Sequence, residues 1–111
     1  MNNKKIEIDV ELDKNNIPEK ILWSSDDGDK SSEEAKAIFL SLWDSKKMET
    51  LKIDLWVKDM PLDHMKIFYY QILRSMSDTF LKATRDEKMS LTIKDFSDYF
   101  AEKMDLKNKF Q

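Results

Sequence analysis

The sequence contains no cysteine, one glycine, one histidine and two prolines in 111 residues. Without cysteine, the chain forms neither disulfide bonds nor a thiolate nucleophile. One glycine is too few for a glycine-rich phosphate-binding loop, and His64 alone leaves a histidine-rich zinc site incomplete. No apolar run approaches the roughly 18 residues of a membrane-spanning helix. We therefore expect no enzyme activity and no direct insertion into a membrane.

Positive and negative side chains are nearly balanced, with 19 Lys and Arg against 22 Asp and Glu and a formal net charge of -3. We therefore expect no field of one sign that would attract nucleic acid or an anionic membrane. The contents of 41% hydrophobic and 37% charged residues are typical of a soluble globular protein. The length fits a single α+β domain over residues 1–111, structured from about 4 to 106. Acids within the first residues argue against a signal peptide, so we expect a cytoplasmic protein.

Residues 37–58 are the most informative stretch, because aliphatic side chains occupy every second position on both sides of a bend. If Ser45–Met48 is the loop, Leu42 lies opposite Leu51. Successive side chains of a strand point to opposite faces, so this register places both aliphatic rows on one face of a β-hairpin. A slip of one residue would undo the match. The rows are Ile38, Leu40 and Leu42, then Leu51, Ile53, Leu55 and Val57.

The other face of this hairpin carries the candidate binding site. The same register places Phe39, Trp43 and Trp56 there, with Trp56 diagonal to Phe39. Tryptophans flanked by charged residues are typical of protein-binding surfaces. Alternatively, this face is a homodimer contact, or it is covered by the chain's own loop, by another hairpin or by curling of the sheet. The candidate partner-binding residues are Phe39, Trp43, Lys52, Asp54, Trp56 and Lys58.

A second hairpin is expected earlier in the chain, over residues 6–24. Every second residue from Ile6 to Leu12 is aliphatic and the residues between them are acidic, which indicates a half-buried strand. The asparagine pair before Pro18 predicts a turn, with Pro18 outside the hydrogen-bonded ladder. The expected register places Val10 opposite Trp23, so Trp23 lies on the core side.

Residues 24–34 form the longest polar break and hold the only glycine, Gly28. Aspartates beside it suggest a calcium loop, but the loop would then begin at Trp23, which fails the oxygen-ligand pattern. We therefore predict a solvated acidic loop and no metal site. A short helix beginning near Ser32 is an alternative to a strand that begins near Lys36.

From Pro61 onward the apolar spacing changes to three and four, which predicts an amphipathic helix of about six turns. Thr84–Glu87 matches a capping box, so a second helix is expected to start near Lys88 or at Ile93 and to reach Met104. Strands followed by helices predict an α+β fold of type ββββαα. It has four antiparallel strands in two hairpins, and two amphipathic helices packed on one sheet face. The first helical stripe is Leu62, Met65, Phe68, Ile72, Leu73, Met76, Phe80 and Ala83.

Three blocks of the chain resemble the GldC family of gliding motility proteins from Bacteroidota. They are KIEIDVELDKNNIPEKILWSSDDG, EEAKAIFLSLWDSKKMETLKIDLWVKDMP and SMSDTFLKATRDEKMSLTIKDFSDYFAEKM, in order from about residue 4 to 106. The most specific pieces are WDSKKMETLKIDLWVKDMP and DFSDYFAEK. The resemblance implies a small cytoplasmic accessory protein of gliding motility, without enzyme activity or cofactor. It implies no set of functional residues, so the candidate site rests on the hairpin alone.

Three functions are compatible with these observations. The first is a non-enzymatic accessory protein that binds another gliding motility component through the aromatic face. The second is a chaperone or adaptor that holds an extended client segment at a sheet edge. The third is a small-ligand-binding domain with a pocket between sheet and helices. Any association with the inner membrane would come through a partner.

Overall fold

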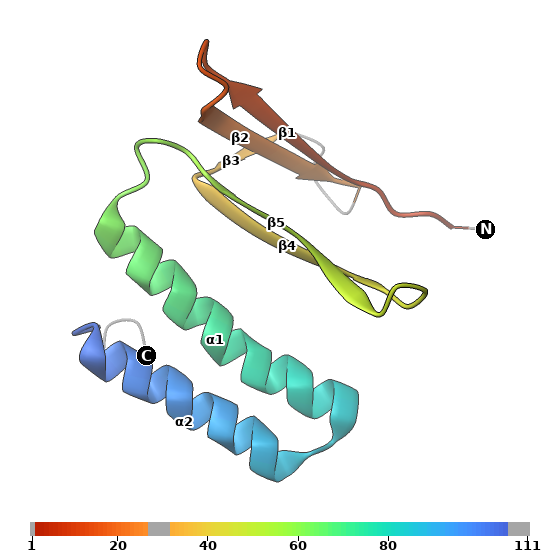
Figure 1. Ribbon diagram of the computed structural model, residues 1–111, viewed down its shortest axis with the longest axis vertical. Coiled ribbons are helices and arrows are strands. Elements are labelled where there is room, and N and C mark those ends of the chain that lie inside the picture. Colours follow the sequence, from red (N-terminus) through yellow and green to blue (C-terminus); the bar gives the residue numbers. More distant parts are fainter. Residues whose placement is uncertain (1, 27–31, 107–111) are drawn as a thin grey trace. The chain divides into compact units, whose positions relative to one another are not determined.

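The computed structural model describes residues 2–26 and 32–106, and it divides into two compact units, residues 1–60 and 61–111. Within these described residues, five strands lie in the first unit and two helices in the second (Figure 1). The α+β class with strands before helices is confirmed, although the strands number five and not four. The single domain and the packing of the helices on a sheet stay predictions. Of the expected loop over residues 24–34, residues 27–31 lie outside the described residues, as does the tail from Lys107. The loop was predicted too long, because Ser24 and Ser25 end one strand and Glu33 and Glu34 begin another.

The strands form two antiparallel sheets. The first sheet has the order β1–β2–β3 and the second consists of β4 and β5. The β1–β2 register is shifted by two residues from the expected one, because Trp23 lies opposite Ile8 and not opposite Val10. An even shift keeps the same face, so Trp23 still lies beside the aliphatic row of β1. The bounds are β1 Ile6–Leu12, β2 Pro18–Ser25, β3 Glu33–Ala35, β4 Ala37–Asp44 and β5 Glu49–Trp56.

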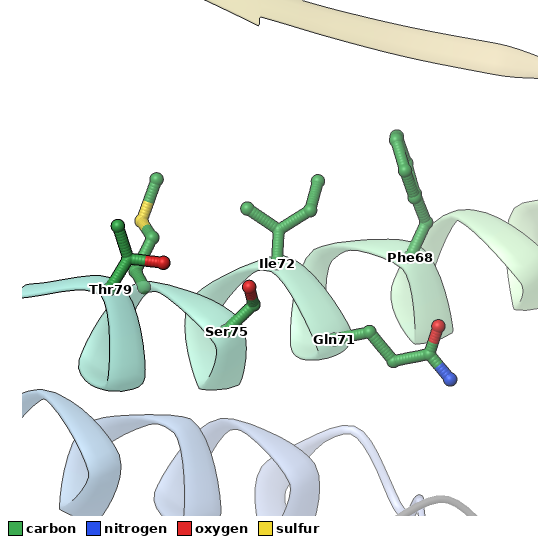
Figure 2. A pocket seen from close by; sticks show the side chains of 6 residues that line it. Phe68, Gln71, Ile72, Ser75 and Thr79 are labelled. Atoms are coloured by element: carbon green, nitrogen blue, oxygen red, sulfur yellow. The ribbon is translucent and has the colours of Figure 1, made fainter. Parts of the chain in front are cut away.

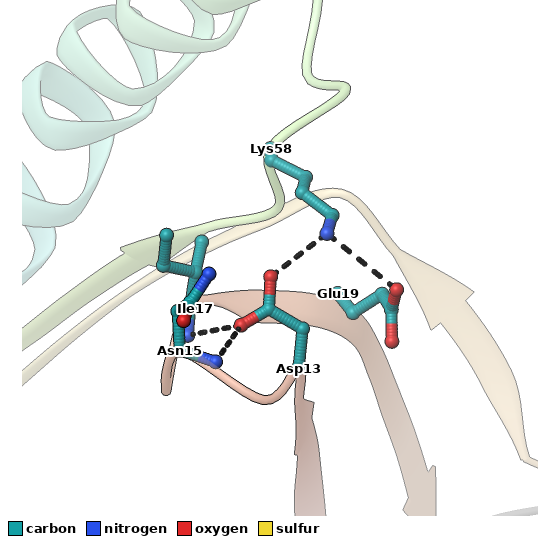
Figure 3. Close-up of polar contacts among 5 residues, drawn as sticks. All are labelled: Asp13, Asn15, Ile17, Glu19 and Lys58. Carbon is teal, nitrogen blue, oxygen red and sulfur yellow. Dashed lines mark hydrogen bonds and ion pairs between the residues drawn. The ribbon is translucent and has the colours of Figure 1, made fainter.

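Asp13 organises the turn between β1 and β2. Its Oδ1 accepts hydrogen bonds from the backbone N–H groups of Asn15 at 2.8 Å and Ile17 at 3.1 Å, as in an Asx turn (Figure 3). Asn16 takes a positive φ of 63°, which asparagine tolerates. Pro18 is the first residue of β2, a position that accepts proline, so the expectation that it lies outside the ladder was wrong. β2 therefore begins inside the segment that the sequence had assigned to the turn.

A single residue, Lys36, separates β3 from β4. β3 pairs with β2, whereas β4 pairs with β5. The backbone hydrogen bond from Val57 N–H to the Lys36 carbonyl, at 2.9 Å, continues the β4–β5 pairing by one residue. The bond from Lys58 N–H to the Pro18 carbonyl, at 3.3 Å, connects the segment after β5 with the first residue of β2. The alternative of a short helix beginning near Ser32 was wrong, because that segment leads into a strand.

The β4–β5 hairpin has the predicted register. Its turn is stabilised by Asp44, whose carboxylate accepts hydrogen bonds from the N–H groups of Lys46 and Lys47. Opposite residues of an antiparallel pair share a face, so the aliphatic rows lie on one face and the aromatic residues on the other. The aliphatic pairs are Leu42 with Leu51, Leu40 with Ile53 and Ile38 with Leu55.

The helices begin and end close to the predicted boundaries. α1 (Leu62–Thr84) follows Pro61 as predicted, and α2 (Glu87–Lys103) begins one residue before the first expected start. Asp86 is the N-cap of α2, because its carboxylate accepts a hydrogen bond from the Met89 N–H at 3.0 Å. The aspartate, and not the threonine of the predicted capping box, therefore caps the helix.

α1 and α2 meet along a seam of small side chains and one tyrosine. Ser90 of α2 donates a hydrogen bond from its hydroxyl to the Ser77 carbonyl of α1 at 2.7 Å. Tyr70, only 1% exposed, forms the core cluster of this unit with Ala101 and Leu106. Tyr70 is therefore a core residue of the helical unit. The buried residues of the two helices are Tyr70, Ser77, Ser90, Ser97 and Ala101.

Part of the predicted apolar stripe of α1 faces away from α2. Phe68 and Ile72 point away from α2 (Figure 2). With Met76 they line a shallow hollow along α1. Phe68, Ile72 and Met76 therefore lie on a second face of α1, separate from the seam of Tyr70 and Ser77, whereas Ile67 packs against the core cluster.

Candidate functional site

The β4–β5 hairpin presents its aromatic residues on one face, as the sequence predicts. Trp43 is 61% exposed and Trp56 is 52% exposed, whereas Phe39 is half-buried. More than half of the surface of each tryptophan is therefore open. The neighbours across the ladder are Asp54 for Phe39, Thr50 for Trp43 and Ala37 for Trp56.

The three aromatic residues do not form one cluster. Trp43 lies opposite Thr50, six positions along β5 from Trp56. At about 3.3 Å per residue, the two tryptophans lie about 20 Å apart along the hairpin. Phe39 is diagonal to Trp56, within reach of aromatic contact. The face therefore has one aromatic end formed by Phe39 and Trp56, and another formed by Trp43 alone.

A charged pair separates the two aromatic ends. The Lys52 Nζ lies 3.3 Å from Oδ2 of Asp54, two residues further along β5 and on the same face. An exposed ion pair of this kind contributes little to folding stability. The pair nevertheless places a hydrogen-bond donor, the Lys52 ammonium, and an acceptor, the Asp54 carboxylate, at the centre of the face. The candidate site therefore has a polar centre between its two aromatic ends.

Lys58, the sixth candidate, lies apart from the aromatic face. Its Nζ is 2.8 Å from Oδ2 of Asp13 and 3.6 Å from Oε1 of Glu19, so it contacts the turn of the first hairpin (Figure 3). The Asp13 contact is the main cause of a raised pKa of Lys58. Lys58 therefore links the segment after β5 to the β1–β2 turn. The alternation of residues along the strand could not predict this contact.

The same contact predicts an unusual titration of Asp13. The Lys58 ammonium, followed by the N–H groups of Ile17 and Asn15, lowers the pKa of Asp13 from 3.8 to about 2. Since the folded state holds the proton less tightly, the stabilising contribution is complete above pH 4 or so and is lost as the pH falls toward about 2. NMR titration of the Asp13 carboxyl carbon should give a pKa of about 2 and not 3.8.

The matched variant for this titration is Lys58→Met, which keeps the length of the side chain and removes the charge. Its Asp13 pKa should rise only part of the way, because the Asn15 and Ile17 N–H groups remain. A wild-type Asp13 that titrates like an unfolded peptide would contradict the contact seen in Figure 3.

The opposite, aliphatic face of the hairpin is also open. Leu42, Leu51 and Ile53 are each about half exposed. Exposure by itself therefore does not separate the two faces of the β4–β5 ribbon. What distinguishes the aromatic face is the chemistry of its side chains, since tryptophan is enriched among residues that dominate binding energy whereas leucine is not.

The first unit also contains an apolar hollow of about 280 Å³. Ile21 and Trp23 of β2 line it together with aliphatic residues of β1 and β4. Trp23 lies on the aliphatic side of its sheet, as predicted, but it keeps 39% of its surface exposed. The space around Trp23 is therefore not filled, but its lining comes from the strands and not from the sheet and helices of the small-ligand hypothesis.

The described residues hold no cluster of metal-binding side chains. His64 is exposed in the first turn of α1, as expected from its position after Pro61. In residues 2–26 and 32–106, no three acidic or histidine side chains gather closely enough to hold a metal ion. Neither α1 nor α2, the helices of the described part, has the length and apolar content to cross a membrane.

Five strands followed by a pair of packed helices define a small α+β protein with an exposed aromatic hairpin face. A family model described as gliding motility-associated protein GldC-like matches residues 18–106. Because this match covers most of the chain, the protein belongs to the GldC-like family of gliding motility-associated proteins, which confirms the resemblance found in the sequence. No curated protein and no solved structure gives a significant match. The family match begins at Pro18 and therefore leaves out β1.

Proposed function

We propose that this protein is a non-enzymatic, cytoplasmic accessory protein of gliding motility that acts by binding another motility protein. The binding surface is the face of the β4–β5 hairpin that carries Phe39, Trp43 and Trp56. The observation that carries the proposal is the exposure of Trp43 and Trp56 on a face whose register is set by the aliphatic residues behind it.

A partner that covers this face would contact both aromatic ends. Tryptophans that become buried in an interface often contribute 2 kcal/mol or more, which is about thirtyfold in affinity. The Lys52–Asp54 pair between them would offer its remaining hydrogen-bonding capacity to polar groups of the partner. Because the ends lie about 20 Å apart along the strands, the partner needs an extended or flat contact surface.

The test is recovery of the partner from gliding cells with the full chain as bait. Trp43→Ala and Trp56→Ala should each weaken recovery, and the double variant should abolish it, because the two residues contact separate parts of the partner. The partner recovered with wild type is then titrated against each purified variant. We expect a loss on the order of thirtyfold for each single tryptophan.

The control is Tyr99→Ala, which removes an equally exposed aromatic side chain from α2. Trp23 remains in the double variant, so its fluorescence reports whether the strands are still folded. Equal recovery by wild type and a folded double variant would refute the aromatic face as the binding surface. Self-association that is lost in the double variant would instead identify a homodimer face.

A further inference from the structure

β1 leaves one edge of the three-stranded sheet open. It is seven residues long and, within residues 2–26 and 32–106, its ladder partner is β2 alone. The backbone N–H and C=O groups on its other side are available to pair with an added strand. Natural sheets protect such edges with proline, bulges, very short strands or charged side chains. β1 has no proline, its one irregularity lies at its last residue, and the protecting feature it does carry is its row of acidic side chains.

The side chains of β1 divide into one acidic and one aliphatic row. Glu7, Asp9 and Glu11 are all exposed on one face. On the other face Ile6 is 70% exposed and begins a row that also borders the apolar hollow. An added strand would place its residues directly beside these rows, because cross-strand neighbours share a face.

The acidic row selects against a second copy of the same strand. In an antiparallel pair of two β1 strands with matching faces, Asp9 lies opposite Asp9 and Glu7 opposite Glu11, and like charges in these positions destabilise the pair. A shift of one residue would instead place the acids of one copy beside the aliphatic row of the other. The charge complement of this edge is therefore a strand with basic residues at every second position.

We propose that the open edge of β1 binds an extended segment of a partner protein in which lysine or arginine alternates with apolar residues. The backbone of the segment pairs with β1, its basic side chains lie beside Glu7, Asp9 and Glu11, and its apolar side chains continue the row of Ile6. This site is distinct from the aromatic face of β4–β5 and does not depend on it.

The probe is a seven-residue peptide of alternating lysine and valine with blocked ends, titrated against the full chain. Three cross-strand charge pairs should make it bind about tenfold more tightly than an alternating glutamate–valine peptide. The peptide should also slow hydrogen exchange of backbone amides within β1. A peptide of the same composition with its lysines and valines in two separate blocks serves as the control for nonspecific attraction.

The matched variant reverses the acidic row with Glu7→Lys, Asp9→Lys and Glu11→Lys, and it should prefer the glutamate–valine peptide. Asp9→Lys alone should weaken the preference for the lysine–valine peptide. This single variant replaces the triple variant in the test if the triple variant does not fold. Equal binding of the alternating and block peptides, unchanged exchange in β1, or no binding would each overturn the proposal. The Trp43/Trp56 double variant should bind the peptide like wild type, so failure of the aromatic-face proposal is distinguishable from failure of this one.

Discussion

Tyr70→Ala is expected to destabilise the helical unit by about 3–5 kcal/mol, the usual cost of truncating a buried aromatic side chain to alanine. Tyr70 is almost completely buried, in contact with Ala101 and Leu106. Its hydroxyl also accepts a hydrogen bond from the Arg74 guanidinium at 3.1 Å. The removal leaves a cavity at the largest of the fully buried side chains in the described residues. Urea unfolding followed by far-UV circular dichroism, which reports mainly on the helices, measures the loss.

Two further variants show how much of the Tyr70→Ala loss comes from packing. One tests the contribution of the Tyr70 hydrogen bond, and the other tests the effect of removing a tyrosine that is not buried. Tyr70→Phe keeps the ring and should cost about 1 kcal/mol. Tyr99→Ala removes a tyrosine that is about half exposed and should change stability by less than about 0.5 kcal/mol. Equal losses for Tyr70→Ala and Tyr99→Ala would contradict the helix seam described above.

Ile21→Ala should destabilise the strand unit by about 2–5 kcal/mol. Ile21 is 0% exposed and lies at the centre of β2, between β1 and β3. Because it already borders the apolar hollow, its removal enlarges an existing space that the surrounding strands do not fill. All three tryptophans belong to the strands, so tryptophan fluorescence in urea follows this unit.

Ile6→Ala is the matched control for Ile21→Ala. Ile6 borders the same hollow but is largely exposed, so its truncation should cost less than about 1 kcal/mol. Both variants replace isoleucine by alanine, so the difference between their losses of stability measures the effect of burial. A similar loss at both positions would show that Ile21 is not the core residue of this unit.

The aromatic face illustrates what could be predicted from the sequence. A strand alternates with a period of two, so Leu42 and Leu51 must share a face, and Phe39, Trp43 and Trp56 must then occupy the other. The tertiary structure added the spacing, which separates Trp43 from Trp56. It also assigned Lys58 to an ion pair with Asp13, because the approach of two hairpins is not encoded in the period of either one.

The helices show the limit of periodicity. The spacing of large apolar residues predicted the extent of α1, and the capping pattern predicted its boundary with α2. The residues buried between the helices, however, include Ser77 and Ser90 as well as Tyr70. Serines carry no apolar signal in a sequence, although their small size suits a close approach of two helices. The apolar stripe therefore did not identify these residues of the helix–helix seam.

Local chemistry thus determined the class of each element, the face of each side chain and the ends of the helices, because alternation, capping and turn residues act over a few positions. Only the folded chain decided the two-residue offset of β1 against β2, the added strand β3 and the identity of the buried seam. An even shift preserves every face, so the hydrophobic pattern accepts several offsets, and the hydrogen bonds of the Asp13 turn select one of them.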